Sequence, residues 1–254
     1  MKKILTTLSC AAILATVASA DFARVEMGVG AWAQKPSGKL SYTNSGVTAN
    51  DESRESQETQ AYVWALIKHP VPVIPNLRLE YTSVKNTGLA SGTFKEFTAP
   101  ANTHTTLTMK QYDVIPYYNI LDNTAWITLD LGLDFKITDA KYEADGVTVS
   151  GVPNTNYSDS AMVVVPLVYV RARVEVPGTN LGVEGDVKYV SYNANVIYDA
   201  RAKVDYTLDF IPVIQPAIEI GYRVQKIKIE DDSAGNIDAD LDFAGVYAGI
   251  MLRF

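Results

Sequence analysis

The chain has 254 residues, of which 47% are hydrophobic and 20% are charged, so a largely disordered protein is excluded. Its formal net charge of −7 argues against binding of nucleic acid or anionic lipid through a basic surface. Tyrosine, with 15 residues, outnumbers phenylalanine (7) and tryptophan (3), and tyrosine is favoured in strands and at boundaries between water and apolar surroundings.

Residues 1–20 have the pattern of a secretory signal peptide. The basic start MKK is followed by an apolar stretch over residues 4–17 and by the sequence ASA, which is an A-x-A cleavage site. A membrane anchor is the alternative, but the apolar stretch is short for that role. We therefore expect residues 1–20 to be removed on export and residues 21–254 to form one domain.

Removal of this leader changes the composition of the chain. The remaining part has no cysteine, and it carries 20 basic and 29 acidic residues, a net charge of −9. An exported protein without disulfides must be stabilised in another way. No run of 18 apolar residues follows the leader, so no membrane-spanning helix is expected.

Alternation of apolar and polar residues with a period of two recurs through most of the chain. In the stretch WITLDLGLDFKI, Leu129, Leu131 and Leu133 alternate with Asp130 and Asp134. This period predicts β-strands, and no convincing amphipathic helix interrupts them. Ten strands are predicted, at residues 22–43, 59–69, 76–86, 104–116, 125–142, 160–176, 181–197, 200–212, 217–230 and 241–254.

The connections between these strands are of two alternating kinds. Polar connections are expected at residues 44–58, 87–103, 143–159 and 231–240, which are long, and near Asp199, where the loop is short. The connections that alternate with them are tight and contain proline. Long loops on one side and short turns on the other are typical of a transmembrane β-barrel. Pro36 and Pro166 interrupt the alternation, and we expect a bulge at each of them.

Two orientations of the strands are compatible with this period. In a soluble periplasmic sandwich the apolar face points inward, whereas in a membrane barrel it faces lipid and the polar face lines the lumen. The leader, the strand lengths and the final stretch VYAGIMLRF, which ends in an aromatic residue, favour the barrel. The predicted fold class is therefore an all-β, antiparallel up-and-down transmembrane β-barrel of about ten strands, with long extracellular loops and short periplasmic turns.

The leader and the segments DFARVEMGVGAW, LGVEGDVKYVSY and VYAGIMLRF together resemble a family of small bacterial outer-membrane β-barrel proteins of uncharacterised role. The resemblance covers essentially the whole chain after the leader, and its motifs are structural. It implies a location in the cell outer membrane and a barrel fold, and it supplies no catalytic residues.

The polar face of the predicted strands carries as many basic as acidic residues. An open ion pore usually has an excess of one sign, and barrels of about eight strands are just filled by side chains. We therefore expect a structural charge network in a plugged or very narrow lumen, held by paired side chains. Its predicted members are Arg24, Glu26, Arg78, Glu80, Asp130, Asp134, Lys136, Arg171, Arg173, Glu175, Glu184, Asp186, Lys188, Arg201, Lys203, Asp205, Asp209, Glu219, Arg223 and Arg253.

The expected function is a structural or interaction role in the outer membrane of a Gram-negative bacterium. The alternative is a narrow channel or transporter for small or hydrophobic molecules. The expected partners are outer-membrane lipid, lipopolysaccharide and, through the C-terminal strand, the barrel-assembly machinery, with no nucleic acid.

Neither histidine, His69 or His104, is accompanied by a catalytic motif, so the chain is not expected to be an enzyme, and no cofactor or metal is predicted. The acidic stretch DDSAGNIDAD lacks the calcium-binding pattern of an EF-hand. Aromatic residues near strand ends are interpreted as membrane-boundary girdles; they are Tyr42, Trp64, Tyr117, Tyr118, Trp126, Tyr192 and Tyr198.

Overall fold

The computed structural model describes residues 23–53, 56–71, 73–208, 214–231 and 236–254. Within these ranges no helix is long and apolar enough to cross a membrane. The regular elements there are strands: β1 (Arg24–Asn44), β2 (Val47–Ser53), β3 (Glu58–Lys68), β4 (Asn76–Thr93), β5 (Phe97–Thr124), β6 (Ile127–Val149), β7 (Val152–Glu175), β8 (Leu181–Tyr192), β9 (Asn195–Thr207), β10 (Gln215–Asp231) and β11 (Ile237–Arg253).

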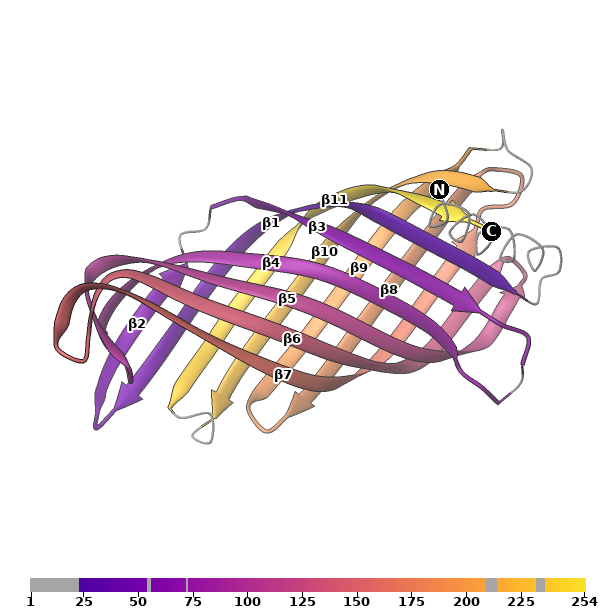
Figure 1. Ribbon diagram of the computed structural model, residues 1–254. Helices are drawn as coiled ribbons and strands as arrows, with labels where there is room; N and C mark the ends of the chain where they lie inside the picture. Colours follow the sequence, from indigo (N-terminus) through magenta and orange to yellow (C-terminus); the bar gives the residue numbers. More distant parts are fainter. Residues whose placement is uncertain (1–22, 54–55, 72, 209–213, 232–235) are drawn as a thin grey trace, which may run out of the picture.

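The strands form one antiparallel sheet that closes into a ring (Figure 1). Closure is made by the first and last strands, where Glu26 pairs with Arg253 and Tyr42 pairs with Ile237. β2 and β3 follow one another between β1 and β4, so they share a single place and the ring has ten strand positions. The predicted up-and-down antiparallel barrel is confirmed, because each of these ten positions pairs with the next one in chain order.

The polar connections take a form that the sequence analysis did not predict. Most of residues 87–103 and 143–159 belong to paired strands, which continue β4 into β5 and β6 into β7 through short turns. Figure 1 shows these hairpins reaching past the rest of the barrel on the left. Residues 87–103 and 143–159 are mostly polar or small, so the period that identified the other strands was weak here.

Neither predicted bulge is found at its proline. The pairing of β6 with β7 keeps one register from Ile127–Val174 to Ala144–Tyr157, past Pro166. β1 also keeps its register with β11 past Pro36. On the other side of β1, the partner changes from β3 to β2 at this level. β1 pairs with β3 as far as Gln34 and with β2 from Lys39, and Pro36, which has no N–H to donate, lies in that gap.

The extended hairpins contain a small core of their own. It consists of Ala90, Phe97, Ala99, Ala144 and Val147, with Phe94, Tyr142, Val149 and Tyr157 packed against it. Beside this core the hydroxyls of Thr105 and Tyr142 each donate a hydrogen bond of 2.8 Å to Asp51 Oδ2. Burial raises the pKa of the Asp51 carboxyl above its usual range, although both hydrogen bonds oppose this effect.

The two faces of the barrel wall have opposite character. On β6 the side chains of Leu131, Leu133 and Phe135 are 47%, 49% and 41% exposed, whereas Asp130 and Asp134 are fully buried. β11 differs, because its inward side chains are mostly aliphatic or aromatic, with Arg253 as the inward charge. On β7 to β10 the same alternation occurs as on β6, with valine and isoleucine pointing outward and charged side chains pointing inward. This arrangement is the inverse of a soluble protein, and it agrees with the membrane-facing orientation expected from the sequence.

A charge placed on the outer face will therefore destabilise the protein in a bilayer. We expect Leu131→Arg to lower the free energy of unfolding by about 2–4 kcal/mol, because Leu131 is near the middle of the apolar part of β6. The measurement is a urea titration of the protein refolded in phosphatidylcholine vesicles. Leu131→Met is the matched control, and an equal stability of the arginine and methionine variants would contradict a lipid-facing position.

Candidate functional site

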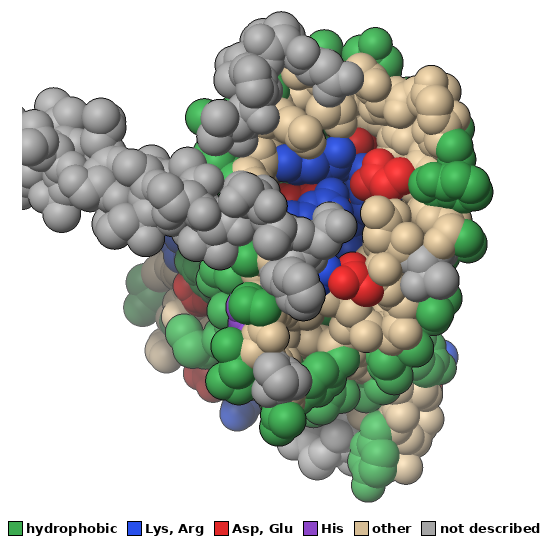
Figure 2. Space-filling view, turned by 90° about the vertical axis from the view of Figure 1, so that its right-hand side faces the viewer, with side chains coloured by type: hydrophobic (Ala, Val, Ile, Leu, Met, Phe, Trp, Pro, Cys, Tyr) green, Lys and Arg blue, Asp and Glu red, His purple; other side chains and the backbone are tan. Residues whose placement is uncertain are grey.

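The interior of the barrel is lined by ionised side chains because every second residue of each strand points inward. Figure 2, which views the barrel from the end near both termini, shows lysine and arginine side chains gathered at the centre with acidic side chains beside them. Hydrophobic side chains lie on the outer wall in the same view. The polar interior and the apolar exterior are thus separated by a single layer of backbone.

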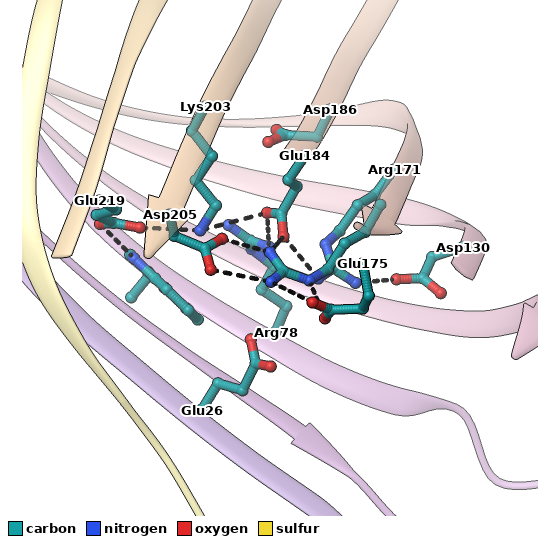
Figure 3. A network of polar contacts seen from close by, with 12 residues as sticks. Glu26, Arg78, Asp130, Arg171, Glu175, Glu184, Asp186, Lys203, Asp205 and Glu219 are labelled. Atoms are coloured by element: carbon teal, nitrogen blue, oxygen red, sulfur yellow. Dashed lines mark hydrogen bonds and ion pairs between the residues drawn. The ribbon is translucent and has the colours of Figure 1, made fainter. Parts of the chain in front are cut away.

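Glu184 on β8 is the centre of one group of ion pairs (Figure 3). Its carboxylate is 2.7 Å from Arg171 Nη2, 3.3 Å from Arg173 Nη1 and 3.4 Å from Arg78 Nη1. Lys203 Nζ is 3.6 Å away on the neighbouring strand. One buried carboxylate therefore contacts four cations from three different strands, β4, β7 and β9, and connects opposite parts of the ring.

Asp205 on β9 joins this group to the closing strand. Arg173 donates two hydrogen bonds to its two carboxylate oxygens, at 2.6 and 3.0 Å, in the forked arrangement that suits a guanidinium. Arg253 Nη2 donates a third at 2.8 Å, and its Nε lies 3.3 Å from Glu26 on β1. The pair between Arg253 and Glu26 thus spans the junction at which the barrel closes.

A second group of ion pairs occupies the part of the lumen farther from the termini. Lys188 donates to Glu80 at 2.6 Å and also to Asp113. Lys136 donates to Asp113 at 2.8 Å, and Arg223 Nε donates to Asp199 Oδ1 at 2.9 Å. Lysine and arginine therefore alternate with carboxylates across β4, β5, β6, β8, β9 and β10.

Buried aromatic side chains fill the space between the ion pairs. Glu219 accepts hydrogen bonds from the Tyr62 hydroxyl at 2.7 Å and from Trp64 Nε1 at 3.2 Å. Lys203 also binds Glu219 and lies 4.6 Å from the centre of the Trp64 ring, within cation–π distance. Gly28 makes room for this indole, because a Cβ atom there would lie 2.3 Å from Trp64 Nε1.

The remaining free space in this region is small. A cavity of about 10 Å³ lies among Trp32, Trp64, Arg201 and Tyr247, which is room for about one water molecule. Within the described ranges, no group of three or more His, Cys, Asp or Glu side chains could hold a metal ion.

Most of the predicted interior charges lie in ion pairs. Those in pairs are Arg24, Glu26, Arg78, Glu80, Asp130, Lys136, Arg171, Arg173, Glu175, Glu184, Asp186, Lys188, Arg201, Lys203, Asp205, Glu219, Arg223 and Arg253. Asp134 is buried and neither of its oxygens has a hydrogen-bond partner. Asp209 lies outside the described residues. Arg24 and Glu175 are the most exposed pair members, at the end near the termini.

Two carboxylates of the interior were missed. Asp199 was placed in a short loop, although it continues the alternation of Arg201, Lys203 and Asp205 along β9. Asp113 lies on β5, where apolar residues occur on both faces and the alternation is weak. The parity of Asp199 relative to Arg201 was a usable signal, whereas that of Asp113 became clear only from its pairing with Lys136.

The girdle interpretation is wrong for three aromatic residues. Tyr42, Trp64 and Tyr117 are 8%, 3% and 1% exposed, so they belong to the interior of the protein. Tyr118, Trp126 and Tyr192 are exposed, as a position on the outer surface requires. Inward and outward aromatic residues near a strand end differ only in their parity, which proximity to the end does not reveal.

No protein-family model and no curated protein sequence matches the chain. Among solved structures, the outer membrane protease OmpT from Escherichia coli is similar with a TM-score of 0.48 at 8% identity, covering 91% of this chain and 96% of that one. The translocator domain of the autotransporter NalP from Neisseria meningitidis is similar with a TM-score of 0.45 at 11% identity, covering 100% of this chain and 96% of that one. A FadL homologue from Pseudomonas aeruginosa has a TM-score of 0.31 at 8% identity, covering 94% of this chain and 92% of that one.

These structures are outer-membrane β-barrels, and at such identities the likeness concerns the fold alone. No sequence family supports the predicted resemblance to small outer-membrane barrel proteins, so the resemblance stays a prediction. The expectation that the chain is not an enzyme is corrected, since one of the matched barrels is a protease and the fold does not exclude enzymes. The similarity identifies no catalytic residue in this chain.

The Glu184 carboxylate provides a test of the charge network. Glu184→Gln leaves the cations around it without their shared counter-charge, so we expect a loss of about 3–5 kcal/mol in the free energy of unfolding. Glu143→Gln is the matched control, because Glu143 pairs with Lys141 on the surface and such pairs contribute at most about 1 kcal/mol. Denaturant titration in detergent micelles measures the free energy of unfolding of each variant. Equal losses would show that the interior pairs contribute no more to stability than the surface pair.

Proposed function

We propose that the chain is an outer-membrane β-barrel with a structural or interaction role, whose lumen is closed by its own ion pairs. The observation that carries the proposal is the inverted polarity of a closed ring, with apolar side chains outside and paired charges inside. This arrangement is unfavourable in water and favourable in a bilayer.

The backbone supports the same conclusion. In hydrocarbon each N–H and C=O group must find a partner within the protein, and a closed barrel satisfies this condition through pairing between strands. β1 and β11 complete the ring over most of their length. On β6 the outward apolar residues run from Ile127 to Ile137, eleven positions, which is the length that a tilted spanning strand needs.

Two further features favour the outer membrane as the location. The leader predicted at residues 1–20 directs export, and both described ends of the chain lie at the end of the barrel opposite the extended hairpins (Figure 1). In bacterial barrels the longer excursions of the chain face the cell exterior. In this arrangement the hairpins of β4–β5 and β6–β7 extend from the cell surface toward lipopolysaccharide, and the C-terminal strand β11 is available to the barrel-assembly machinery.

The charge balance of the lumen supports closure. Selective pores usually line the lumen with an excess of one sign, whereas these interior cations and carboxylates contact one another directly. A ten-position ring is also narrow, since wide channels need about sixteen strands.

Conductance tests the closed lumen. In a planar bilayer, the refolded protein is expected to give no resolved channel openings, because ion pairs and aromatic rings fill its cross-section. A variant with Arg78, Arg171 and Glu184 all changed to alanine removes the centre of one group and should conduct, which provides the positive control. Open-channel steps from the unaltered protein would instead favour a narrow channel or transporter. Heat-modifiable migration on a detergent gel shows, for each sample, that the barrel has folded.

Surface labelling tests the location and its sidedness. Ala194 is exposed in the turn between β8 and β9, and Gly178 is exposed in the opposite turn between β7 and β8. On intact cells, a membrane-impermeant maleimide should label Ala194→Cys and spare Gly178→Cys. Both variants should react after the outer membrane is permeabilised. Labelling of the Gly178→Cys variant alone on intact cells would reverse the proposed orientation, and labelling of neither would contradict the surface location.

A further inference from the structure

The edge of β7 is unpaired where this strand rises above β8. β7 pairs with β6 up to Val152, but its pairing with β8 ends at Val168–Tyr189. The last residues of β8, Val190 to Tyr192, pair only with β9. Among the described strands, the part of β7 before Val168 therefore has one neighbour, and its other edge is free.

The backbone groups that point to this edge follow from the alternation along the strand. Glu175 N–H donates to Trp126 on the β6 side, whereas Val176 N–H donates to Leu181 on the β8 side. Because the direction alternates and the register with β6 does not shift between Val174 and Tyr157, the even-numbered residues face β8. The N–H and C=O groups of Ser158, Ser160, Met162 and Val164 thus point to the free edge. Pro166, which has the same parity, has no N–H.

The part of this edge between Asp159 and Pro166 lacks the usual protection against pairing. Exposed edges in natural proteins carry lysine, proline, inward charges or bulges, which prevent addition of another strand. The run from Ser160 to Val165, SAMVVV, contains none of these, and Met162, Val163 and Val164 are 71%, 51% and 57% exposed. A short uncharged run rich in β-branched residues is well suited to receive another strand.

The lower part of the edge lies at the level of lipid. Val164 pairs with Ile137, which pairs with Tyr112, and all three point outward within the apolar part of the wall. Open sheet edges do not occur in the hydrocarbon region, because nothing there replaces the missing hydrogen bonds. Another extended segment is therefore expected to pair with this stretch of β7 and to satisfy its free N–H and C=O groups.

We propose that the free edge of β7, from Ser158 to Val164, binds an extended segment of another polypeptide by strand addition. The segment continues the position of β8 and runs antiparallel to β7, and it is uncharged with alternating apolar residues to match Met162 and Val164. This inference rests on the proposed membrane barrel and adds a partner class to it. A second copy fits poorly, since strands tilted by about 40° in two barrels of one membrane would cross rather than pair.

Amide hydrogen exchange tests the free edge without any partner. In the refolded barrel labelled with ¹⁵N at Ala, Met and Val, the Met162 amide should exchange at least about tenfold faster than those of Ala161 and Val163, which bond to β6. Equal protection of the three amides would mean that β7 is already paired on both sides, and it would overturn the inference. Heat-modifiable migration of the same sample reports separately whether the barrel has formed.

A peptide then tests strand addition. The probe is an eight-residue alternation of threonine and valine with a lysine at each end, and the control is the same peptide fully N-methylated, which has no N–H groups between residues. The unmodified peptide should slow Met162 exchange by at least about tenfold, and the methylated one should not. Equal protection by both peptides, or by neither, contradicts backbone pairing at this edge. Protection that rises with barrel concentration in the absence of peptide would assign the edge to self-association and also contradict the proposal.

Two proline variants complete the test. Met162→Pro removes an N–H that faces the free edge and leaves the ladder to β6 intact, so the barrel should fold and peptide protection at Val164 should be lost. Ala161→Pro removes a bond to β6 and serves as the comparison for the effect of proline on folding. If the Met162→Pro barrel folds and its Val164 amide is still protected by the peptide, strand addition at β7 is excluded.

Discussion

The pairing of charges within a closed ring is the constraint on which the rest of the structure depends. An ionised side chain that faces lipid costs several kcal/mol at mid-depth, so each charged residue of a spanning strand must be inside. Inside, it must also meet an opposite charge, because desolvation is costly without one. A shift of one residue in any strand would place its charges in lipid and its leucines in the lumen, so the ion pairs specify the register of the whole barrel.

Arginine and lysine are distributed differently, because lysine occurs on the outer wall as well as in the interior, where Lys136, Lys188 and Lys203 lie. The described arginines lie inside or at the rim of the lumen; they are Arg24, Arg78, Arg171, Arg173, Arg201, Arg223 and Arg253. Seven lysines lie on the outer wall beyond the apolar stretch, at Lys35, Lys39, Lys85, Lys110, Lys141, Lys226 and Lys228. The planar guanidinium binds carboxylates through two bonds in a dry interior, while the more strongly hydrated ammonium favours contact with water.

The uneven height of the barrel wall has a physical basis and a consequence. Strands β4 to β7 continue beyond the apolar stretch because their hairpins form a second core and pair with one another. β8 and β9 turn back earlier, at Asn193 and Ala194. The difference leaves the upper part of β7 without a neighbour, so the same extension that stabilises the hairpins also creates the free edge.

The sequence by itself determined most strands of the barrel wall and the side of each that is polar. A period of two is imposed by strand geometry, and charges that share a parity within one strand, such as Asp130 with Asp134 and Arg171 with Arg173, identified the inner face before any pairing was known. In residues 87–103 and 143–159 the few apolar residues that enter the hairpin core do not recur with a sustained period of two, so nothing distinguished a strand from a polar loop, and the hairpin extensions were missed.

Only the tertiary structure decided which charges meet. Glu184 contacts Arg78 from more than a hundred positions away because the ring brings β4 opposite β8, and local alternation contains no information on such distant contacts. The same holds for Trp64 and Tyr117, whose inward parity depends on the register of their strands. The break between β2 and β3 and the free edge of β7 also depend on partners that end at different heights, which is a property of the assembled sheet.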